Sequence, residues 1–393
     1  MIKVNILKNW SYPDLFFQTP ENKGIWNDIE FVNASEQPCD FVIVLNYPEQ
    51  DIIVECPPDH VWAIIQEPPT EYRKLTHLGD PNYARIYTTD IELNGQKYFQ
   101  SQPALPWHIN RSYDFLKSVD VPKKSDNISW VTSNQRAIKG HRDRMSFLES
   151  IREKLKFDLF GRGFNPIDDK WQAIAPYRYT IAIENYSNPF YWSEKLSDCF
   201  LAWTMPIYYG CTRITEYFPA ESMILIDIHR PDEAMERIHE AIQSQQWKKN
   251  LEAIHFAREQ VLDHYQFFPY ITEKIKQDKK ILLSQETCPI FIPAYPRDTQ
   301  IAEHDAQLSK LDAQLAERNA QLAERNAQLT ERNAQLVERD AQLAAIYSSK
   351  TWRVALWLRR IRLWLAPPKS LQARMVTWLF SIARKMVTTH PPR

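Results

Sequence analysis

Short apolar runs that suit buried strands recur along the first 230 residues of the chain. The runs are continuously apolar rather than alternating, as in "DFVIVLN" and "YTIAIEN". Strands of a parallel sheet that is covered on both faces have this pattern, whereas half-exposed strands alternate. We therefore predict parallel strands at residues 3–7, Asp40–Asn46, His60–Gln66, Ile128–Asn134, Phe157–Gly163, 179–185 and Ser222–Ile228.

Helical spacings separate these runs. In Arg142–Lys156, four apolar residues from Met145 to Leu155 follow one another at intervals of three and four. Pro231–Gln243 carries the same pattern, which places its apolar residues on one face of a helix. Alternating strands and helices indicate the α/β class, and two such sets along the chain predict two α/β domains.

The composition changes twice after the α/β part of the chain. Leucines at intervals of seven begin near residue 305, and a basic segment rich in tryptophan begins near residue 347. We therefore expect four parts. They are a first α/β domain (1–122), a second α/β domain (123–298), a heptad-repeat helix (299–346) and a basic amphipathic tail (347–393).

The overall charge conceals a division between body and tail. The net charge of the chain is −1. Residues 350–393 contain ten Lys and Arg and no Asp or Glu, whereas residues 1–349 carry a net charge of −11. The five cysteines form no Cys-x-x-Cys pair, and no apolar run follows "MIKVNILKNW", so a signal peptide is not expected. A reduced, cytoplasmic setting is the expectation that follows.

Common phosphate and metal motifs are absent from the sequence. Only seven glycines occur, and neither Gly-x-Gly-x-x-Gly nor Gly-x-x-x-x-Gly-Lys-Ser/Thr is found. There is no Asp-x-Asp pair and no His-Glu-x-x-His. We expect no metal and no cofactor. Any phosphate must be bound by Arg or Lys side chains and by helix N-termini.

The segment "YRYTIAIENYSNPFYWSEKL" brings polar groups to the end of a predicted strand. The strand ends on Glu184 and Asn185, and a helical pattern opens with Glu194 and Lys195. Strand ends and helix starts meet at the carboxyl edge of a parallel sheet, where ligands of open α/β sheets bind. Carboxylates there can accept hydrogen bonds from sugar hydroxyls, and an ammonium group can pair with a diphosphate. Taken singly, the carboxylates could instead be helix caps or surface groups.

The longer segment "YTIAIENYSNPFYWSEKLSDCFLAWTMPIYYGC" resembles the donor-binding signature of the α1,3-fucosyltransferases, glycosyltransferase family 10. In that family a strand ends in Glu-Asn, a tyrosine-containing turn follows, and a helix begins with Glu-Lys. A Pro-hydrophobic-aromatic-x-Gly strand comes next, here Pro206–Gly210. The similarity extends through "WVTSNQRAIKGHRDRMSFLESI" and "KFDLFGRG" and, more loosely, "WAIIQEPP" and Asn9–Trp10, over about residues 1–275.

The resemblance implies the GT-B architecture of two facing Rossmann-like domains, with the acceptor side first and the donor side second. It implies GDP-fucose as the donor substrate and a metal-independent transfer with inversion. Arg144 matches the family's phosphate-binding arginine, but one residue of the aromatic pair that follows it is Leu148, so Arg142 remains a rival. The donor-binding residues that the resemblance implies are Arg144 or Arg142, Glu184, Asn185, Tyr186, Glu194 and Lys195.

For the general base the resemblance points to Glu67. This carboxylate follows the run "VWAIIQ" and precedes Pro68–Pro69, which would stiffen the turn. Asp90 and Glu92 in "YTTDIEL" stand at another strand end and remain alternatives, and Glu67 could also be an ordinary loop carboxylate. The matching pair Asn9 and Trp10 would lie on the acceptor side.

Two departures from the family pattern fall inside the signature. Tyr186 replaces the small hydroxyl residue after Glu-Asn, and Ser193 replaces the threonine before Glu-Lys. Serine keeps the capping hydroxyl. A tyrosine at position 186 would change the wall of the donor pocket.

The heptad segment predicts a long helix with a narrow apolar stripe. Leucines recur every seven residues from Leu308 to Leu343, at position d of each heptad. Every position a is polar, from Asp305 through Asn319 to Asp340. Buried Asn pairs specify parallel dimers at a cost in stability. We expect a spacer helix, either solvated or forming a weak parallel homodimer over residues 305–343. Bacterial members of the resembled family carry similar repeats before a basic tail.

The tail predicts contact with an anionic membrane surface. The apolar runs in "KTWRVALWLRRIRLWLAPP" are broken by Arg well before the roughly 20 residues that a membrane span needs. Tryptophans among cations suit the headgroup region. Binding to nucleic acid and packing onto the catalytic part are alternatives, and we expect no nucleic-acid partner. The predicted location is the inner face of the bacterial cytoplasmic membrane.

These observations predict an inverting fucosyltransferase that acts on a hydroxyl group of a glycan containing N-acetylglucosamine. A transferase that uses another nucleotide sugar is one alternative. A non-catalytic scaffold that binds glycan or membrane is another, although Glu67, Arg144, Glu184, Glu194 and Lys195 occur together in the sequence.

Overall fold

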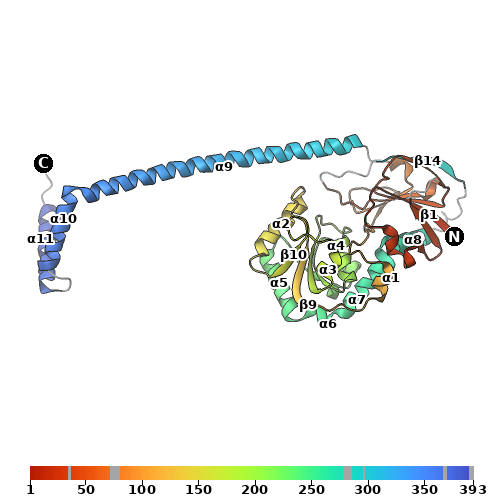
Figure 1. Ribbon diagram of the computed structural model, residues 1–393, viewed down its shortest axis with the longest axis horizontal. Coiled ribbons are helices and arrows are strands. Elements are labelled where there is room, and N and C mark those ends of the chain that lie inside the picture. Colours follow the sequence, from red (N-terminus) through yellow and green to blue (C-terminus); the bar gives the residue numbers. More distant parts are fainter. Residues whose placement is uncertain (34–36, 71–79, 278–285, 295–296, 366–369, 389–393) are drawn as a thin grey trace. The chain divides into compact units, whose positions relative to one another are not determined.

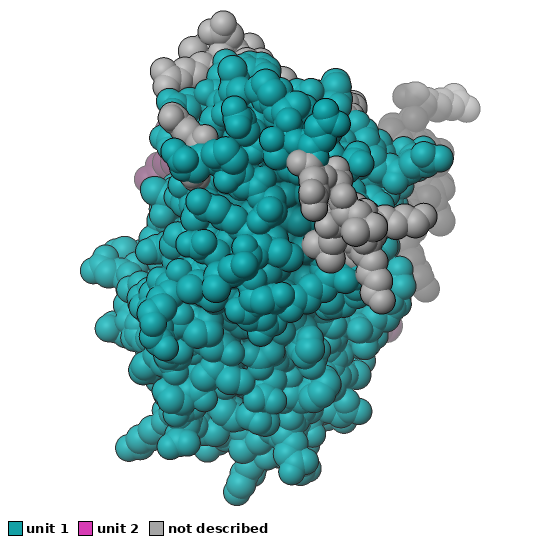
Figure 2. All heavy atoms as spheres, turned by 90° about the vertical axis from the view of Figure 1, so that its right-hand side faces the viewer, with its two compact units in different colours: residues 1–301 teal, residues 302–393 magenta. Residues whose placement is uncertain are grey.

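The computed structural model describes residues 1–33, 37–70, 80–277, 286–294, 297–365 and 370–388. The chain forms two compact units, which comprise residues 1–301 and 302–393. Figure 2 shows the first unit as one continuous body of packed side chains. Both large sheets and all the buried core residues of the described chain belong to this unit.

Seven strands form the first sheet, in the order β2-β3-β1-β4-β6-β7-β8. Neighbouring strands are parallel except β2 and β3, which are antiparallel. All residues of the central strands β4 and β6 are buried, as their continuous apolar runs predict. The strands are β1 (Ile2–Lys8), β2 (Ile25–Trp26), β3 (Ile29–Asn33), β4 (Phe41–Leu45), β6 (Val61–Ile64), β7 (Arg85–Thr88) and β8 (Tyr98–Gln100).

Segments from far along the chain cover both faces of the first sheet. Helix α8 (Phe267–Gln277) packs on one face through Phe267, Phe268 and Ile271. Strand β14 (Cys288–Ile292) pairs antiparallel with β5 (Ile52–Cys56) and contributes Ile292 to the core on the other face. In Figure 1, α8 and β14 lie beside the strands of the first half. The division predicted from the sequence had placed both segments in the second domain, and its boundaries remain a prediction.

The second sheet is entirely parallel, in the order β10-β9-β11-β12-β13. Helices α2 and α5 pack on one face, and α4 and α7 pack on the other. The strands are β9 (Ser125–Val131), β10 (Phe157–Phe160), β11 (Tyr177–Ile183), β12 (Met205–Tyr209) and β13 (Ile224–Leu225). The helices are α2 (Lys139–Ile151), α3 (Lys170–Ile174), α4 (Glu194–Leu201), α5 (Pro231–Gln243), α6 (Gln246–Lys249) and α7 (Leu251–Gln260).

Short helical turns connect these elements. Helix α1 (Tyr113–Ser118) begins at Ser112, whose hydroxyl caps it by accepting from the Phe115 amide. A π-helical turn at Val261–Tyr265 joins α7 to α8. The remaining turns are 3-10 helices at Leu15–Gln18, Pro20–Asn22, Pro58–His60, Asp80–Asn82, Ile214–Glu216 and Ala220–Ser222.

The predicted fold class is confirmed. Two α/β halves, each built on a largely parallel sheet, pack in one unit, which is the GT-B arrangement expected from the sequence. Helix α5 has the predicted bounds, and each of the seven predicted runs contains or overlaps a strand, with shifts of a few residues at the strand ends. The weakest match is Ser222–Ile228, where the strand is reduced to the two residues of β13.

The second unit is helical wherever the structure describes it. Helix α9 (Arg297–Ser348) begins at the end of the first unit and covers all the heptads. The d-position leucines from Leu322 to Leu343 are about half exposed. Helices α10 (Lys350–Leu365) and α11 (Leu371–Thr388) follow. Among the described residues, no helix combines the length and the apolar character that crossing a membrane requires.

Candidate active site at the carboxyl edge of the second sheet

Glu184 is the first residue after strand β11 and lies at the floor of the site. Only 1% of it is exposed. Its carboxylate accepts hydrogen bonds from the backbone amide and the hydroxyl of Ser193, at 2.8 and 2.7 Å. Burial raises its pKa, and the nearby Lys195 opposes that shift. Glu184 therefore ties the end of β11 to the start of helix α4.

A glycine after strand β12 makes room for this carboxylate. A Cβ atom at Gly210 would lie 2.4 Å from Cγ of Glu184 and 2.6 Å from the hydroxyl of Tyr208. Both distances are shorter than any normal contact, so a larger residue would displace the Glu184 side chain. The lack of space for a side chain therefore explains why the Pro-hydrophobic-aromatic-x-Gly strand ends in glycine.

The first turn of helix α4 holds Lys195 between two carboxylates. Its ammonium group lies 3.5 Å from Glu184 and 3.4 Å from Glu194, and 3.1 Å from the hydroxyl of Ser193. Burial lowers the pKa of Lys195, but the two carboxylates outweigh this effect and raise the pKa above its usual value. Lys195 is therefore a fixed positive charge at the helix start, where the partial positive end of the helix adds to it.

Arg144 faces the site from helix α2, whereas Arg142 faces away. Arg144 is 4% exposed, and the charges of Glu184 and Glu194 act on it. Its Nη2 donates to the carbonyl and the hydroxyl of Ser133, at 3.4 Å each, and its buried Nε has no hydrogen-bond partner among the described residues. Arg142 is exposed and donates to the carbonyl of Ala137 at 2.7 Å.

A second pair of buried charges stands behind the first and was not predicted from the sequence. Lys170 forms an ion pair with Asp198 at 2.6 Å, and Asp198 is fully buried. Its other oxygen accepts from the backbone amide of His108 at 2.9 Å. Burial raises the pKa of Glu194, but Lys195 and Lys170 outweigh it, so that the pKa lies well below its usual value. Glu194 is therefore an ionised carboxylate.

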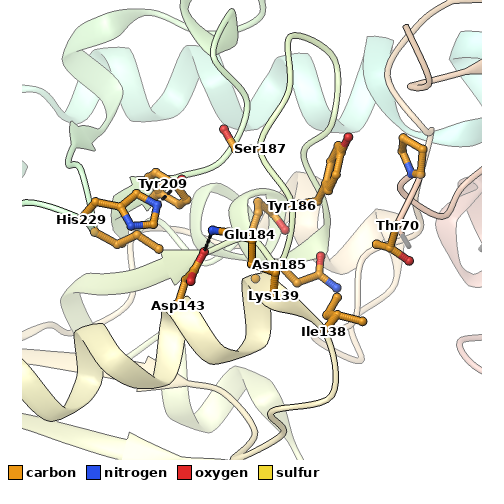
Figure 3. A pocket seen from close by; sticks show the side chains of 13 residues that line it. Thr70, Ile138, Lys139, Asp143, Glu184, Asn185, Tyr186, Ser187, Tyr209 and His229 are labelled. Atoms are coloured by element: carbon orange, nitrogen blue, oxygen red, sulfur yellow. Dashed lines mark hydrogen bonds and ion pairs between the residues drawn. The ribbon is translucent and has the colours of Figure 1, made fainter. Parts of the chain in front are cut away.

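A cavity of about 350 Å³ opens in front of Glu184 (Figure 3). Pro69 and Thr70 line it from the first half, and the other lining residues belong to the second half. The cavity therefore lies between the two halves. The other residues that line it are Ile138, Lys139, Gly140, Asp143, Glu184, Asn185, Tyr186, Ser187, Tyr209, Ile228 and His229.

Close backbone contact shapes the floor of this cavity. A Cβ atom at Gly140 would lie 1.8 Å from the carbonyl oxygen of Asn185, so only glycine lets helix α2 approach β11 this closely. The side-chain oxygen of Asn185 is buried and has no hydrogen-bond partner among the described residues. On the cavity wall, Lys139 pairs with Asp143 at 2.5 Å, and Tyr209 with His229 at 3.2 Å.

All three candidate bases lie just beyond the carboxyl ends of strands in the first sheet. Glu67 follows β6 and stands two residues before Pro69, which lines the cavity. Asp90 and Glu92 follow β7, and their charges act on Tyr186 in the cavity wall. This loop touches the second half directly, because the amide of Asn188 donates to the carbonyl of Thr89 at 2.7 Å. The choice of base among the three carboxylates stays open.

Asn9 and Trp10 lie beyond the end of β1 and do not line the cavity. The ammonium group of Lys8 sits 4.6 Å from the Trp10 ring centre, and the partly buried ring packs against the core of the first sheet. Their predicted acceptor-side role remains a prediction.

Comparison with known proteins places this site within a described family. Residues 121–280 match the sequence model of "Glycosyltransferase family 10 (fucosyltransferase) C-term". A human 4-galactosyl-N-acetylglucosaminide 3-alpha-L-fucosyltransferase is 25% identical over 177 residues, which are 42% of this chain and 43% of that protein. Another 4-galactosyl-N-acetylglucosaminide 3-alpha-L-fucosyltransferase, from Pongo pygmaeus, is 23% identical over 176 residues, or 42% of this chain and 45% of that protein.

Solved structures with a related chain path include two transferases. An α1,3-fucosyltransferase with GDP-fucose aligns over 68% of this chain and 92% of its own, at 16% identity and a TM-score of 0.38. An α-glucosyltransferase bound to UDP and DNA aligns over 72% and 100%, at 12% identity and a TM-score of 0.47. The chain spans about half the length of the curated relatives that it matches. Residues 121–280, which contain Arg144, Glu184, Glu194 and Lys195, are therefore similar to the carboxyl-terminal domain of the fucosyltransferases of glycosyltransferase family 10.

Proposed function

We propose that this protein is an inverting glycosyltransferase that transfers fucose from GDP-fucose to a hydroxyl group of a glycan containing N-acetylglucosamine. The observation that carries the proposal is the charge cluster of Lys195 with Glu194 and the buried Glu184, where β11 ends and α4 begins, inside the residues that match the family. The names of the relatives, which describe transfer to galactosyl-N-acetylglucosaminides, support this class of acceptor.

In this proposal, Lys195 and Arg144 bind the diphosphate of the donor. The buried guanidinium group of Arg144 has an unused Nε, and its charge acts on the ammonium group of Lys195, so the two cations lie near each other. Both groups are suited to phosphate oxygens. As the bond from the sugar to the diphosphate breaks, negative charge develops on the leaving phosphate. The two cations stabilise that charge without rearrangement because they are already in place.

Glu194 and Asn185 are proposed to hold the hydroxyl groups of the donor. Glu194 is ionised, and its side chain is 18% exposed, so a ligand can reach it. Asn185 offers a buried oxygen that lacks a partner among the described residues. Glu184 has a different role here, since Ser193 and Lys195 already occupy its oxygens. It positions the start of α4 rather than binding the sugar.

The acceptor hydroxyl is proposed to lose its proton to Glu67, with Asp90 or Glu92 as alternatives. The acceptor oxygen attacks the anomeric carbon from the side opposite the diphosphate, and the carboxylate takes the proton. A new glycosidic bond forms while the bond to GDP breaks, so the configuration at the anomeric carbon is inverted. Metal-free transfer fits two cations that neutralise the leaving group. Retention of activity in excess chelator tests that part of the proposal.

A panel of nucleotide sugars tests the donor directly. Purified protein is incubated with GDP-fucose, GDP-mannose, UDP-galactose and UDP-N-acetylglucosamine, with and without a galactosyl-N-acetylglucosamine disaccharide. We expect release of GDP from GDP-fucose, accelerated by the disaccharide, with fucose recovered on the glycan. Turnover of a UDP sugar instead would identify that nucleotide sugar as the donor in place of GDP-fucose. Absence of any turnover by folded protein would favour a non-catalytic glycan-binding role.

We further propose that the second unit attaches the enzyme to an anionic membrane surface. Tryptophan and leucine side chains of α10 and α11 are largely exposed, including Trp357, Trp364 and Trp378. Cations alternate with them, and no acid occurs after residue 349. Side chains of this kind favour the boundary between headgroups and acyl chains. Attachment at the inner face of a bacterial cytoplasmic membrane and a weak parallel dimer through residues 305–343 both belong to this proposal.

A further inference from the structure

A second cavity, of about 450 Å³, lies beside strands β7 and β8 of the first unit and is not used by the proposed transfer chemistry. Its walls come from both halves of the unit. They carry five aromatic rings, those of Tyr87, Phe99, Tyr217, Tyr265 and Tyr270, and we call this cavity the aromatic groove.

The rings of the aromatic groove support one another. Tyr87 lies 5.4 Å from Phe99 and 6.1 Å from Tyr270, measured between ring centres, and Tyr217 lies 5.5 Å from Tyr265. Two cations stack on the outer rings: Arg85 lies 5.4 Å from the centre of Phe99, and Lys274 lies 5.3 Å from that of Tyr270. Because each ring is in contact with a neighbour, the groove is formed before any ligand binds.

Amide side chains complete the groove and join its two walls. Gln102 donates to the carbonyl of Tyr265 at 3.0 Å and so connects the first half to the second. Gln100 also lines the groove, and no carboxylate lines it among the described residues. Flat rings bordered by amide and hydroxyl groups suit a sugar ring, whose C–H face is apolar and whose rim is a set of hydroxyls.

Residues in both walls of the aromatic groove contact residues that belong to the candidate active site or adjoin it. In one wall, Tyr217 and Tyr265 each lie 6.0 Å from Trp192, the residue that precedes Ser193 at the start of α4. In the other wall, Gln100 donates to the carbonyl of Asp90 at 2.9 Å, and Asp90 is a candidate base beside Tyr186. The groove is therefore joined through packed rings and a hydrogen bond to residues next to those on which donor and acceptor would meet.

We propose that the aromatic groove binds the part of an acceptor oligosaccharide that extends beyond the sugar that receives the transfer. This inference rests on the proposed function and names the substrate more closely: a chain of several sugars rather than a single unit. Stacking in the groove tightens binding of long acceptors. It does not touch the reacting atoms, so the maximal rate with a short acceptor is independent of it.

The test compares two acceptors on one variant and one control. Phe99→Ala removes a ring that is 37% exposed, so the fold tolerates the change. Phe256→Ala is the matched control, because Phe256 is 51% exposed on α7 and lines neither cavity. The acceptors are a galactosyl-N-acetylglucosamine disaccharide and the tetrasaccharide made of two such units, each at saturating GDP-fucose.

We expect Phe99→Ala to raise KM for the tetrasaccharide by about three- to tenfold, which is the contribution of one aromatic contact, and to leave kcat unchanged. KM for the disaccharide should stay within about twofold, since the shorter acceptor does not reach the groove, and Phe256→Ala should alter neither value. An equal change for both acceptors, or no change for the tetrasaccharide, would overturn the proposal.

Direct binding separates failure of this inference from failure of the proposed function. The tetrasaccharide is titrated against the full-length protein without donor, and binding is followed by saturation-transfer NMR. Signal transfer that Phe99→Ala abolishes and Phe256→Ala preserves supports the groove even if no nucleotide sugar is turned over. If the protein transfers fucose but Phe99→Ala does not weaken binding of the tetrasaccharide, the proposed function is supported and the proposed role of the aromatic groove is refuted.

Discussion

The two units of this protein differ in which side chains they bury and which they expose to water. The first unit buries several charged side chains and pairs some of them with opposite charges, as it pairs the fully buried Asp198 with the partly buried Lys170. The second unit leaves large apolar side chains in water, with Trp364 and Leu371 each 81% exposed. Buried charges are costly unless they are paired or used, and exposed apolar patches mark surfaces that bind something else. The first unit therefore has the features of a site that binds charged groups, and the second unit has an exposed apolar surface, which fits the attachment that we propose for it.

The largest effect should come from the proton acceptor in the first unit. Glu67→Gln keeps the size of the side chain and removes the base, so transfer should fall by about 10²–10⁴-fold. Binding of GDP-fucose, measured by calorimetry, should be nearly unchanged because Glu67 follows β6 in the first sheet, whereas the proposed donor residues belong to the second half. Full transfer by this variant would pass the role to Asp90 or Glu92, whose Asn and Gln variants are the next to measure.

A smaller loss is expected from the donor cations. Lys195→Ala and Arg144→Ala each remove a charge-assisted contact to phosphate, which is worth about 1.5–3 kcal/mol, or roughly 10–150-fold in kcat/KM. Arg142→Ala is the matched control on the same helix and should stay close to the parent, since that side chain is exposed. If Arg142→Ala were the damaging change and Arg144→Ala the harmless one, the diphosphate would have to lie elsewhere.

Changes in the second unit should weaken membrane binding without lowering the rate of transfer. Truncation after Leu343 removes all ten cations of residues 350–393 and the exposed tryptophans. Each cation near an anionic leaflet contributes about 1 kcal/mol, so sedimentation with anionic vesicles should be lost while turnover of a soluble acceptor persists. Full-length protein with Arg359, Arg360 and Arg362 changed to Gln should bind these vesicles more weakly. Undiminished sedimentation of the truncated protein would assign the attachment to residues 1–343.

The smallest effect concerns a buried cation that has no carboxylate partner. Lys124 donates to the carbonyl of Ala202 and the hydroxyl of Thr204, at 2.6 and 2.9 Å, and burial lowers its pKa to about 6. Between pH 6 and about 10 the unfolded chain holds a proton that the folded chain has lost, so Lys124 makes stability rise with pH by roughly 1 kcal/mol per unit.

Lys124→Met removes this titration and should flatten that part of the pH profile. Chemical unfolding at pH 7 and pH 9 measures it, and the change between the two pH values should be about 1–2 kcal/mol smaller in the variant than in the parent. Other titrating groups contribute equally to both proteins and cancel. Parallel profiles for variant and parent would mean that Lys124 keeps its proton in the folded state.

The grouping of Glu184, Glu194 and Lys195 could be predicted because these residues are close in sequence, while their role in binding the donor stays a prediction. Glu184 and Lys195 are separated by a single turn, and the Glu-Asn and Glu-Lys pairs fall at fixed offsets from a recognisable strand. Arg144 and Arg142 could not be ranked, because a helical pattern does not show which of two neighbours faces inward. The structure separates them by burial.

The pairings that the sequence did not reveal join residues far apart. Lys170 and Asp198 belong to different helices, and each alone looks like an ordinary surface charge. Asp198 follows Glu194 by four residues on α4, so the two carboxylates share a helix face, and that spacing is the one signal that could have been used. The aromatic groove is harder still, since its rings come from three separate stretches between residues 87 and 270.

Helix α8 has a consequence for how such enzymes can be rebuilt or inherited. The family-matching segment ends with a helix whose phenylalanines are buried against the first sheet, next to Phe31. If residues 121–280 were transplanted into a relative, they would therefore take α8 with them. The first half that remained would lack the helix that packs on one face of its sheet. Exchanges between relatives should succeed only when the crossover lies before Phe267, so that each first sheet keeps its own closing helix.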